Sequence, residues 1–500
     1  MKGASYAFLA VGDLHYDREA FHVPGAAADD GYIAMWKARM PAFLDRMARR
    51  ARAERAAFAL QLGDFANAPF ADFDIQCRAL EEAWTRIDSA LGVTTYPVMG
   101  NHESYKAHGY PAYRHVMTPK IAALLGAPSG ASHDVHYAFM RGVDLFVAID
   151  TNRADMFDFV QETFARHPES RYVFVMGHAP ILPSSTGQVG YLTPFELDPR
   201  GRLLALLQSR NAIYLCGDLH TLGFCEYVGS EGRFVQIAAS SVCTDAKRAF
   251  QDGPDYPATT EEAAGARRAV GGDASPVWRR FRDGMVRHWV GDGAMFYVVH
   301  VSDARVVATL HLHDREEPAK MFVLHDADTD VQPLGMDLPR YFTPGANAVS
   351  LRKPPSLAAL PTAVAFDLPE GWKVEGGNPV AMPGAEATVR IVRPAEPRLS
   401  RRPERIRARL LDGEGRLRAN AFAIFLHQDV LDVPRHDSAA RLPHRPPMGF
   451  EGAPGRRLEF SWDEERLHVA ARLRDETFSP LPPEAAEAWW TGPSLELFLD

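Results

Sequence analysis

The chain has 500 residues, of which 46% are hydrophobic and 24% are charged, and its formal net charge is −9. This length predicts two or three domains, because one hydrophobic core rarely serves more than about 250–300 residues. The acidic balance gives no global attraction to nucleic acid or to an anionic membrane. No apolar run reaches the roughly 18 residues that a membrane-spanning helix needs.

The first part of the chain alternates short apolar runs with amphipathic stretches, which is the pattern of an α/β layered domain. Apolar residues at helical spacing predict helices at four places: 33–57, 75–91, 158–166 and 201–209. Residues 136–150 predict a β-hairpin whose turn is Arg141-Gly142. These elements describe a layered domain of sheets and helices.

Five apolar runs of this region end in the same way, with a glycine followed at once by a carboxylate, an amide or an imidazole. The five ends are Gly12-Asp13-Leu14-His15, Gly63-Asp64, Gly100-Asn101-His102-Glu103, Gly177-His178 and Gly217-Asp218-Leu219-His220. A single Gly-Asp after a strand is weak evidence, because turns favour both residues for backbone reasons. Five such ends in one half of the chain predict that their polar side chains share one site.

This ordered series resembles the calcineurin-like metallophosphoesterases, and the resemblance covers about the first 240 residues. It implies a four-layer α-β-β-α sandwich with the metal ligands on loops at one end. It also implies two divalent ions as cofactors, drawn from Mn, Fe, Zn and Mg. Carried over position by position, the ligands of the first ion are Asp13, His15 and His220, Asp64 bridges the two ions, and Asn101 and His178 hold the second.

The fifth block departs from the family pattern, which usually reads Gly-His-x-His. This chain has Asp218 in place of the first imidazole. If Asp218 is a ligand, the second site loses one unit of positive charge and favours harder ions such as Mn²⁺, Fe²⁺ or Mg²⁺. If it is not, the second ion binds weakly or arrives with the substrate. We predict that Asp218 ligates, because carboxylate and imidazole serve comparable coordination geometries.

The function that the resemblance implies is metal-dependent hydrolysis of a small phosphate mono- or diester. The expected mechanism is in-line attack of a hydroxide generated by the two ions, without a covalent enzyme intermediate. His102, paired with Glu103, is expected to protonate the leaving oxygen. Two alternatives stay open: a nuclease, which the acidic balance disfavours, and a degenerate site in a glycan-binding or interaction protein.

Residues 244–293 are turn-rich and predict a helical insertion that carries six arginines. These side chains would form either a lid that clamps phosphate or a solvated excursion. The arginines are Arg267, Arg268, Arg279, Arg280, Arg282 and Arg287. Residues 295–301 and 305–312 then predict a strand pair that completes a first domain at 1–330.

The remaining chain predicts an all-β region. Alternating strands and Pro/Gly turns at 331–430 resemble an immunoglobulin-like spacer, and 431–500 resembles the opening half of a family-nine-type carbohydrate-binding module. Trp489 and Trp490 offer either a sugar-stacking platform or core packing. The tail therefore predicts a glycan partner, an extracellular or periplasmic location, and a chain that continues past Asp500. Because this numbering shows no signal peptide, the cytoplasm is the alternative.

Overall fold

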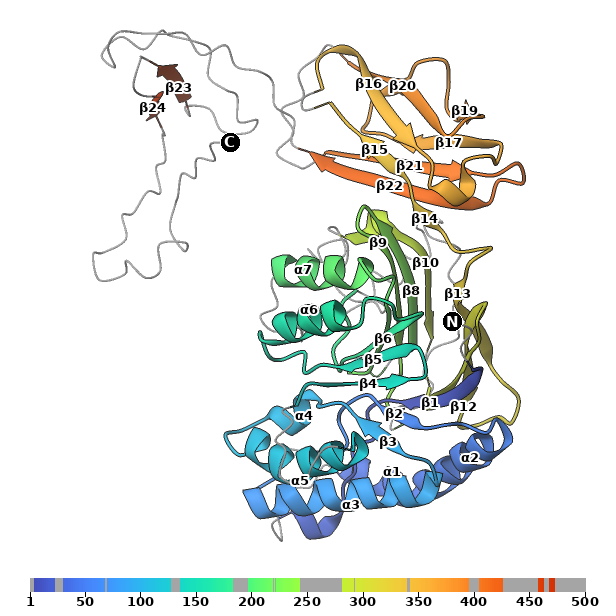
Figure 1. The fold of residues 1–500 in the computed structure, drawn as a ribbon. Coiled ribbons are helices and arrows are strands. Elements are labelled where there is room, and N and C mark those ends of the chain that lie inside the picture. The colour runs from blue at the N-terminus through green and yellow to red at the C-terminus, as the bar shows by residue number, and fades with distance from the viewer. Residues whose placement is uncertain are drawn as a thin grey trace.

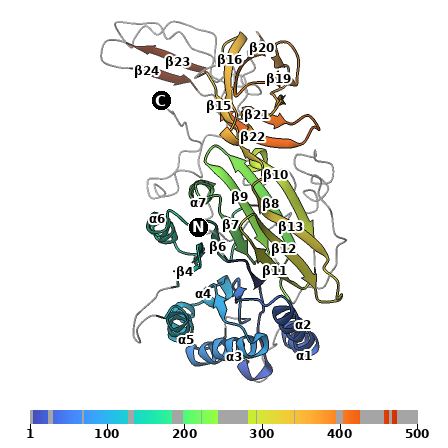
Figure 2. The ribbon, with the colours of Figure 1, turned by 45° about the vertical axis from the view of Figure 1, so that its right-hand side comes forward.

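The computed structural model of the protein describes most of the chain. The described residues are 4–22, 30–67, 70–126, 135–182, 197–218, 220, 222–242, 281–291, 293–339, 342–394, 404–425, 457–462 and 467–472. Figures 1 and 2 show how their elements are arranged. No helix in these ranges is long and apolar enough to cross a membrane.

The first sheet has six strands in the order β13-β12-β11-β1-β2-β3. Its strands are β1 (Tyr6–Val11), β2 (Ala59–Gln61), β3 (Thr95–Pro97), β11 (Met295–Val301), β12 (Arg305–Leu312) and β13 (Lys320–Asp326). Strands β1, β2 and β3 are parallel, whereas β11 pairs antiparallel with β1. The predicted strand pair at 295–301 and 305–312 is confirmed, and β11 joins it to the sheet.

The second sheet has seven strands in the order β10-β8-β9-β7-β6-β5-β4. Its strands are β4 (Tyr137–Arg141), β5 (Asp144–Ala148), β6 (Val173–Met176), β7 (Ile213–Cys216), β8 (Leu222–Gly229), β9 (Gly232–Ala238) and β10 (Met285–Gly291). Strands β5, β6, β7 and β9 are parallel, so their carboxyl ends share one edge of the sheet.

The two sheets pack face to face through buried aromatic rings. Phe8 of the first sheet makes edge contacts with Phe146 and Phe174 of the second, at 5.5 Å between ring centroids in each case. Helices cover the outer faces (Figures 1 and 2). The helices on the side of the first sheet are α1 (Asp30–Ala38), α2 (Met40–Ala53), α3 (Phe73–Leu91), α4 (Asn101–Ser104) and α5 (Gly109–Leu124). Those on the side of the second sheet are α6 (Met156–Arg166) and α7 (Leu197–Gln208). The predicted α-β-β-α layering is confirmed.

Most predicted local elements are confirmed, with one correction near the N-terminus. The predicted helix 33–57 is two helices, α1 and α2, which meet at Arg39. The cause is Pro41 in the first turn of α2, where proline is tolerated because the N–H it lacks would have no partner there. The predicted hairpin is confirmed as β4 and β5, with Gly142 in the turn at φ 62°.

The region predicted as a helical insertion needs a second correction. A strand, β10, occupies Met285–Gly291 and pairs antiparallel with β8, so this part is not helical. Arg287 on that strand pairs with the buried Glu226 of β8, so its guanidinium is engaged in the fold. Four of the six predicted arginines, Arg267, Arg268, Arg279 and Arg280, lie outside the described residues.

Two further sheets, mostly antiparallel, follow and enclose one core. Their orders are β14-β22-β21-β17-β19 and β15-β16-β20-β18. The strands are β14 (Gln332–Pro333), β15 (Gly335–Asp337), β16 (Gly345–Arg352), β17 (Thr362–Asp367), β18 (Lys373–Val374), β19 (Val380–Met382), β20 (Glu386–Arg393), β21 (Glu404–Leu411) and β22 (Leu417–Phe425). Val349 and Ile391 of one sheet share a buried cluster with Ile406 and Leu410 of the other. The all-β prediction is confirmed for this region, and its immunoglobulin-like identity stays a prediction.

The all-β region contacts the second sheet at the turn between β8 and β9. The side-chain amide of Asn420 donates to the carbonyl oxygen of Val228 at 3.0 Å, and the rings of Tyr227 and Phe422 meet edge on. Because β9 runs parallel to β7, this turn lies at the opposite end of the sheet from the carboxyl end of β7. The contacts of Asn420 and Phe422 with the second sheet therefore lie away from that carboxyl edge.

Within 431–500 the structure describes one hairpin, formed by β23 (Arg457–Trp462) and β24 (Leu467–Arg472). Trp489 and Trp490 lie outside the described residues. The carbohydrate-binding module, its glycan partner and the compartment stay predictions.

Candidate metal centre

The predicted ligands come together where strands of both sheets end. Parallel strands share their carboxyl edge, so residues that directly follow them are brought side by side. Asp13 and His15 follow β1, Asp64 follows β2, Asn101 follows β3, His178 follows β6, and Asp218 and His220 follow β7. The side chains of the five blocks therefore lie close together at this edge.

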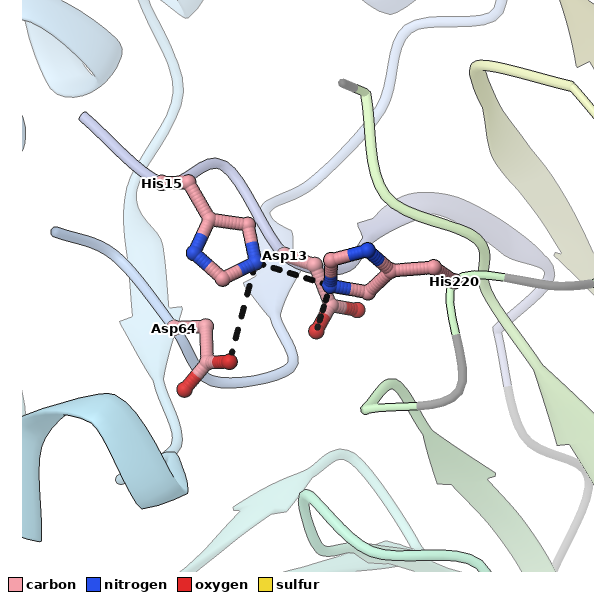
Figure 3. Close-up of side chains that lie close together, drawn as sticks. All are labelled: Asp13, His15, Asp64 and His220. Atoms are coloured by element: carbon pink, nitrogen blue, oxygen red, sulfur yellow. Dashed lines mark hydrogen bonds and ion pairs between the residues drawn. The ribbon is translucent and has the colours of Figure 1, made fainter. Parts of the chain in front are cut away.

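The first group of ligand atoms comprises Asp13, His15, Asp64 and His220 (Figure 3). Their four ligand atoms all lie within 4.8 Å of one another. The Nε2 atoms of His15 and His220 are 2.8 Å apart, and Asp64 Oδ2 lies 3.7 Å from His15 Nε2. The side chain of His220 is 33% exposed, whereas the other three are buried. The group is therefore open to solvent on the His220 side.

A second group surrounds the ring of His178. Its Nε2 atom lies 2.7 Å from Asn101 Oδ1, 3.3 Å from Asp64 Oδ2 and 3.6 Å from Asp218 Oδ1. The same oxygen of Asp64 therefore faces both groups. All four side chains of this group are largely buried.

The backbone at the ligand positions adopts a conformation that side chains disfavour. Among the described residues, eight that are not glycine have positive φ, and five of these are predicted ligands. They are Asp13, His15, Asp64, Asp218 and His220, with φ between 34° and 71°. This left-handed region costs about 1–2 kcal/mol for most residues. The surrounding fold therefore holds the loops in the conformation that turns these side chains toward one point.

Four of the five block glycines are required by space, namely Gly63, Gly100, Gly177 and Gly217, and two of them lie against a ligand carboxylate. A Cβ atom on Gly100 would collide with the side chain and the amide of Asp64. A Cβ atom on Gly217 would lie 2.5 Å from Asp13 Oδ2. A glycine before the ligand thus lets a neighbouring carboxylate pack against the backbone, which gives the sequence motif a steric reason.

Hydrogen bonds from the backbone orient the ligands. His178 Nδ1 donates to the carbonyl oxygen of Leu62 at 2.8 Å, which turns the Nε2 atom of the ring toward the site. Asp64 Oδ1 accepts from the amide of His102 at 3.0 Å, which leaves Oδ2 facing the histidines. The carboxylate of Asp13 accepts from the amide of Asp218 at 3.0 and 3.1 Å.

Burial shifts the titration of these groups. It raises the pKa of Asp13 well above its usual range and also raises the pKa of Asp218. Burial would raise the pKa of Asp64 too, but His178 and His102 outweigh it and hold that pKa below its usual range. Burial lowers the pKa of His15 well below the ordinary value and that of His220 to about 4. Burial would also lower the pKa of His178, but Asp64 and Asp13 outweigh it and raise that pKa well above its ordinary value. The site thus combines two neutral imidazoles, those of His15 and His220, with an ionised Asp64.

These residues fit divalent cations. Asp218 Oδ2 is buried and makes no hydrogen bond to any described residue, and an unpaired buried carboxylate is costly. Oxygen and imidazole nitrogen atoms are the ligands that Mn²⁺, Fe²⁺, Zn²⁺ and Mg²⁺ take in proteins. A cation at this point would offset the buried negative charge and engage the atoms that face it.

The comparison with known sequence families decides the identity of this region. Residues 6–222 match the family described as calcineurin-like phosphoesterase. This part of the chain is a calcineurin-like phosphoesterase domain. Together with the metal-binding group, it indicates a hydrolase that acts on phosphate esters. No curated protein matches the sequence significantly.

Several solved structures resemble part of this chain. GAP50, the anchor in the inner membrane complex of Plasmodium, is 12% identical, with 64% of this chain and 89% of that chain covered at a TM-score of 0.38. Purple acid phosphatase PPD1 from yellow lupin (Lupinus luteus) seeds is 13% identical, with 64% and 54% covered and a TM-score of 0.40. PhoD is 11% identical, with 65% and 70% covered and a TM-score of 0.40. These scores lie below 0.5, so the likenesses support no further statement about this protein.

The two predicted catalytic residues of the phosphoesterase domain occupy different places. The side chain of His102, in the first turn of α4, is 23% exposed, and its Nε2 atom lies 3.9 Å from Asp64 Oδ2. Glu103 is fully buried, and its oxygens accept from the amides of Gly100 at 2.9 Å, Asp64 at 3.0 Å and Ala66 at 3.1 Å. Burial and the nearby Asp64 raise the pKa of Glu103 to about 7. Glu103 thus connects the loops after β2 and β3, whereas the side chain of His102 is partly exposed to solvent.

Three residues near this edge of the sheets, Asp150, Tyr110 and Tyr105, were not predicted from the sequence. Asp150 follows β5 at the same sheet edge, is fully buried and accepts from the hydroxyl of Tyr110 at 2.7 Å. Its signal was an apolar run that ends in a carboxylate without a glycine. The hydroxyl of Tyr105 lies 2.6 Å from the side-chain nitrogen of Asn101. The only sequence signal for Tyr105 was its position directly after the third block.

Proposed function

We propose that this protein is a metal-dependent phosphoesterase that hydrolyses a small phosphate mono- or diester with the help of two divalent ions. The observation that carries the proposal is the shared position of Asp64. Its Oδ2 atom lies 3.7 Å from His15 Nε2 on one side and 3.3 Å from His178 Nε2 on the other. A carboxylate between two groups of ligands is what a pair of neighbouring ions requires.

The two ligand groups follow from this placement. The first ion would be held by Asp13, His15, Asp64 and His220, and the second by Asp64, Asn101, His178 and Asp218. When bound, two such ions supply hydroxide near neutral pH and polarise the phosphoryl oxygens. The completeness of both groups supports catalysis over a degenerate site.

The second group contains one imidazole and three oxygen ligands, because Asp218 stands where the family usually has histidine. Oxygen-rich sites favour harder ions, so we expect Mn²⁺, Fe²⁺ or Mg²⁺ there in preference to Zn²⁺. The first group, with two imidazoles, is expected to accept a wider choice of ions.

His102 is the proposed general acid, which protonates the leaving oxygen. Its partial exposure and its place beside Asp64 support this role. The bond from its own amide to Asp64 Oδ1 fixes the backbone that carries the ring. Glu103 is a positioning residue in this scheme, because its oxygens bind backbone amides on both loops.

The test is hydrolysis of nitrophenyl phosphate and bis-nitrophenyl phosphate by the full chain, stripped of metal and refilled with Mn²⁺, Fe²⁺, Zn²⁺ or Mg²⁺. We expect turnover that requires metal and is lost in Asp64→Ala. The preferred ester distinguishes a monoesterase from a diesterase. Absence of turnover with every metal would overturn the proposal in favour of a binding role.

A further inference from the structure

The side-chain amide of Asn101 lies between two partners of different kinds. Its oxygen is 2.7 Å from His178 Nε2, and its nitrogen is 2.6 Å from the hydroxyl of Tyr105. Because His178 Nδ1 donates to Leu62, its Nε2 atom is an acceptor when the ring is neutral, which is the form that binds a cation. Two acceptors therefore face each other, which is unfavourable for a hydrogen bond but suitable for two ligands of one cation.

The opposite orientation of the amide has its own hydrogen bonds. Turned over, the nitrogen of Asn101 would donate to His178 Nε2 at 2.7 Å and to Asp64 at 3.2 Å, and the oxygen would accept from Tyr105 at 2.6 Å. With a neutral His178 ring and no cation, this second orientation is favoured. With a cation the oxygen must face His178 and Asp64, because the carbonyl oxygen is the ligand atom.

The hydroxyl of Tyr105 stabilises the metal-binding orientation of the Asn101 amide more than it stabilises the turned-over orientation. In that orientation the hydroxyl accepts from the nitrogen of Asn101, a residue that is only 8% exposed. In the turned-over orientation the same nitrogen is served by His178 and Asp64 instead. Removal of the hydroxyl would thus leave a buried N–H without its partner in the loaded protein, whereas the metal-free protein would lose only one bond to a carbonyl oxygen.

We propose that Tyr105 is a positioning residue that holds the carbonyl oxygen of Asn101 toward the second metal ion. This inference rests on the proposed function, because it takes Asn101 as a ligand. Tyr105 directly follows α4, and its ring lies 5.2 Å from that of His102. The Phe variant keeps this ring contact and removes only the hydroxyl, which makes it the sharpest probe.

The experiment is calorimetric titration of the metal-stripped full chain with Mn²⁺. The wild type is expected to bind two ions. Tyr105→Phe is expected to bind the second ion about 10-fold more weakly and the first with unchanged affinity, which is the low end for loss of a group that orients a metal ligand. A residue that served only the fold would weaken both ions together or neither.

Tyr110→Phe is the matched control. Tyr110 lies five residues after Tyr105, and its hydroxyl donates to Asp150 Oδ2 at 2.7 Å. In the described part of the chain this hydroxyl has no hydrogen bond to a proposed ligand. We expect this variant to bind both ions as the wild type does. Equal isotherms for Tyr105→Phe and the wild type would overturn the inference and leave the proposed function standing, as would an equal loss in both variants. Fewer than two ions in the wild type would instead contradict the proposed function itself.

Discussion

The Nε2 atoms of His15 and His220 lie 2.8 Å apart although 205 residues separate them along the chain. One follows β1 of the first sheet and the other follows β7 of the second, so their contact joins the two sheets at one edge (Figure 3). The metal centre therefore exists only when both sheets have formed and packed. Substitutions that alter the spacing between the two sheets should therefore weaken metal binding first, and a loss of activity should follow from the lost metal.

Gly100→Ala is predicted to weaken binding of both ions, because both ligand groups share Asp64. The backbone of Gly100 is extended, at φ −95°, so alanine is conformationally acceptable, but its Cβ atom would displace Asp64. Metal content by mass spectrometry and the free energy of unfolding measure the two effects, and overpacking of this kind costs about 1–3 kcal/mol. Gly92→Ala is the control, because nothing lies within 4 Å of the added atom there. That variant should lose about 1–2 kcal/mol through its left-handed backbone and keep both ions.

Asp218→His is predicted to shift the second site toward Zn²⁺. The change restores a second imidazole and removes one negative charge, both of which favour softer ions. Competition between Zn²⁺ and Mn²⁺ for the stripped protein gives the preference directly. Asp218→Asn, which loses the charge without gaining an imidazole, should bind the second ion more weakly without favouring Zn²⁺. The same preference in the wild type and Asp218→His would show that Asp218 is not a ligand.

His102→Ala is predicted to slow hydrolysis of alkyl phosphates by about 10²–10⁴-fold, the usual contribution of a general acid. Nitrophenyl esters should lose less, because nitrophenolate leaves without a proton. Parallel kcat measurements on the two esters, at full metal occupancy, check this. His22→Ala is a control with the same 23% side-chain exposure, and its partner is Asp17. Equal losses on both esters would argue against a proton donor at position 102.

Glu226→Gln is predicted to destabilise the fold around the second sheet at neutral pH. Burial alone would raise the pKa of Glu226, but Arg233 and Arg287 outweigh it and hold that pKa below its ordinary 4.5. The carboxylate therefore stabilises the fold above pH 4.5, and this contribution is lost as the pH falls through the lowered pKa. Removing one partner of a buried ion pair costs about 3–5 kcal/mol.

Urea unfolding of the full chain as a function of pH measures this effect. The wild type should lose stability on acidification below about pH 4.5, whereas Glu226→Gln should be weaker at pH 7 and show a flatter profile in acid. Glu231 is exposed and lies in the turn between β8 and β9, so Glu231→Gln should have the stability of the wild type at each pH. A Glu226→Gln variant as stable as the wild type at pH 7 would contradict the ion-pair account.

The strand ends could be predicted from the sequence, because each block is a local pattern: a buried strand, then a glycine, then a polar side chain. Parallel strands share an edge, so five local patterns were enough to place His178 next to Asp64. The break between α1 and α2 was also visible, in Pro41, but the apolar spacing on either side of it favours one continuous helix. Local patterns were therefore sufficient to predict most of the strands and helices that carry the site.

The supporting contacts could not be predicted, because they depend on distant parts of the fold. The bond from His178 to the carbonyl oxygen of Leu62 spans 116 residues. The oxygens of Glu103 bind backbone amides, which carry no sequence signal at all. Strand β10 was predicted as helical because its turn-rich flanks suggested an excursion, whereas the open edge of β8 offered it a sheet partner.

The most direct measurement of the central claim is anomalous diffraction from a crystal of the full chain loaded with Mn²⁺. Two peaks about 3.5–4 Å apart are predicted, with the carboxylate of Asp64 between them. Asp13, His15 and His220 should surround one peak, and Asn101, His178 and Asp218 the other. A single peak, or two peaks that Asp64 does not bridge, would contradict the account.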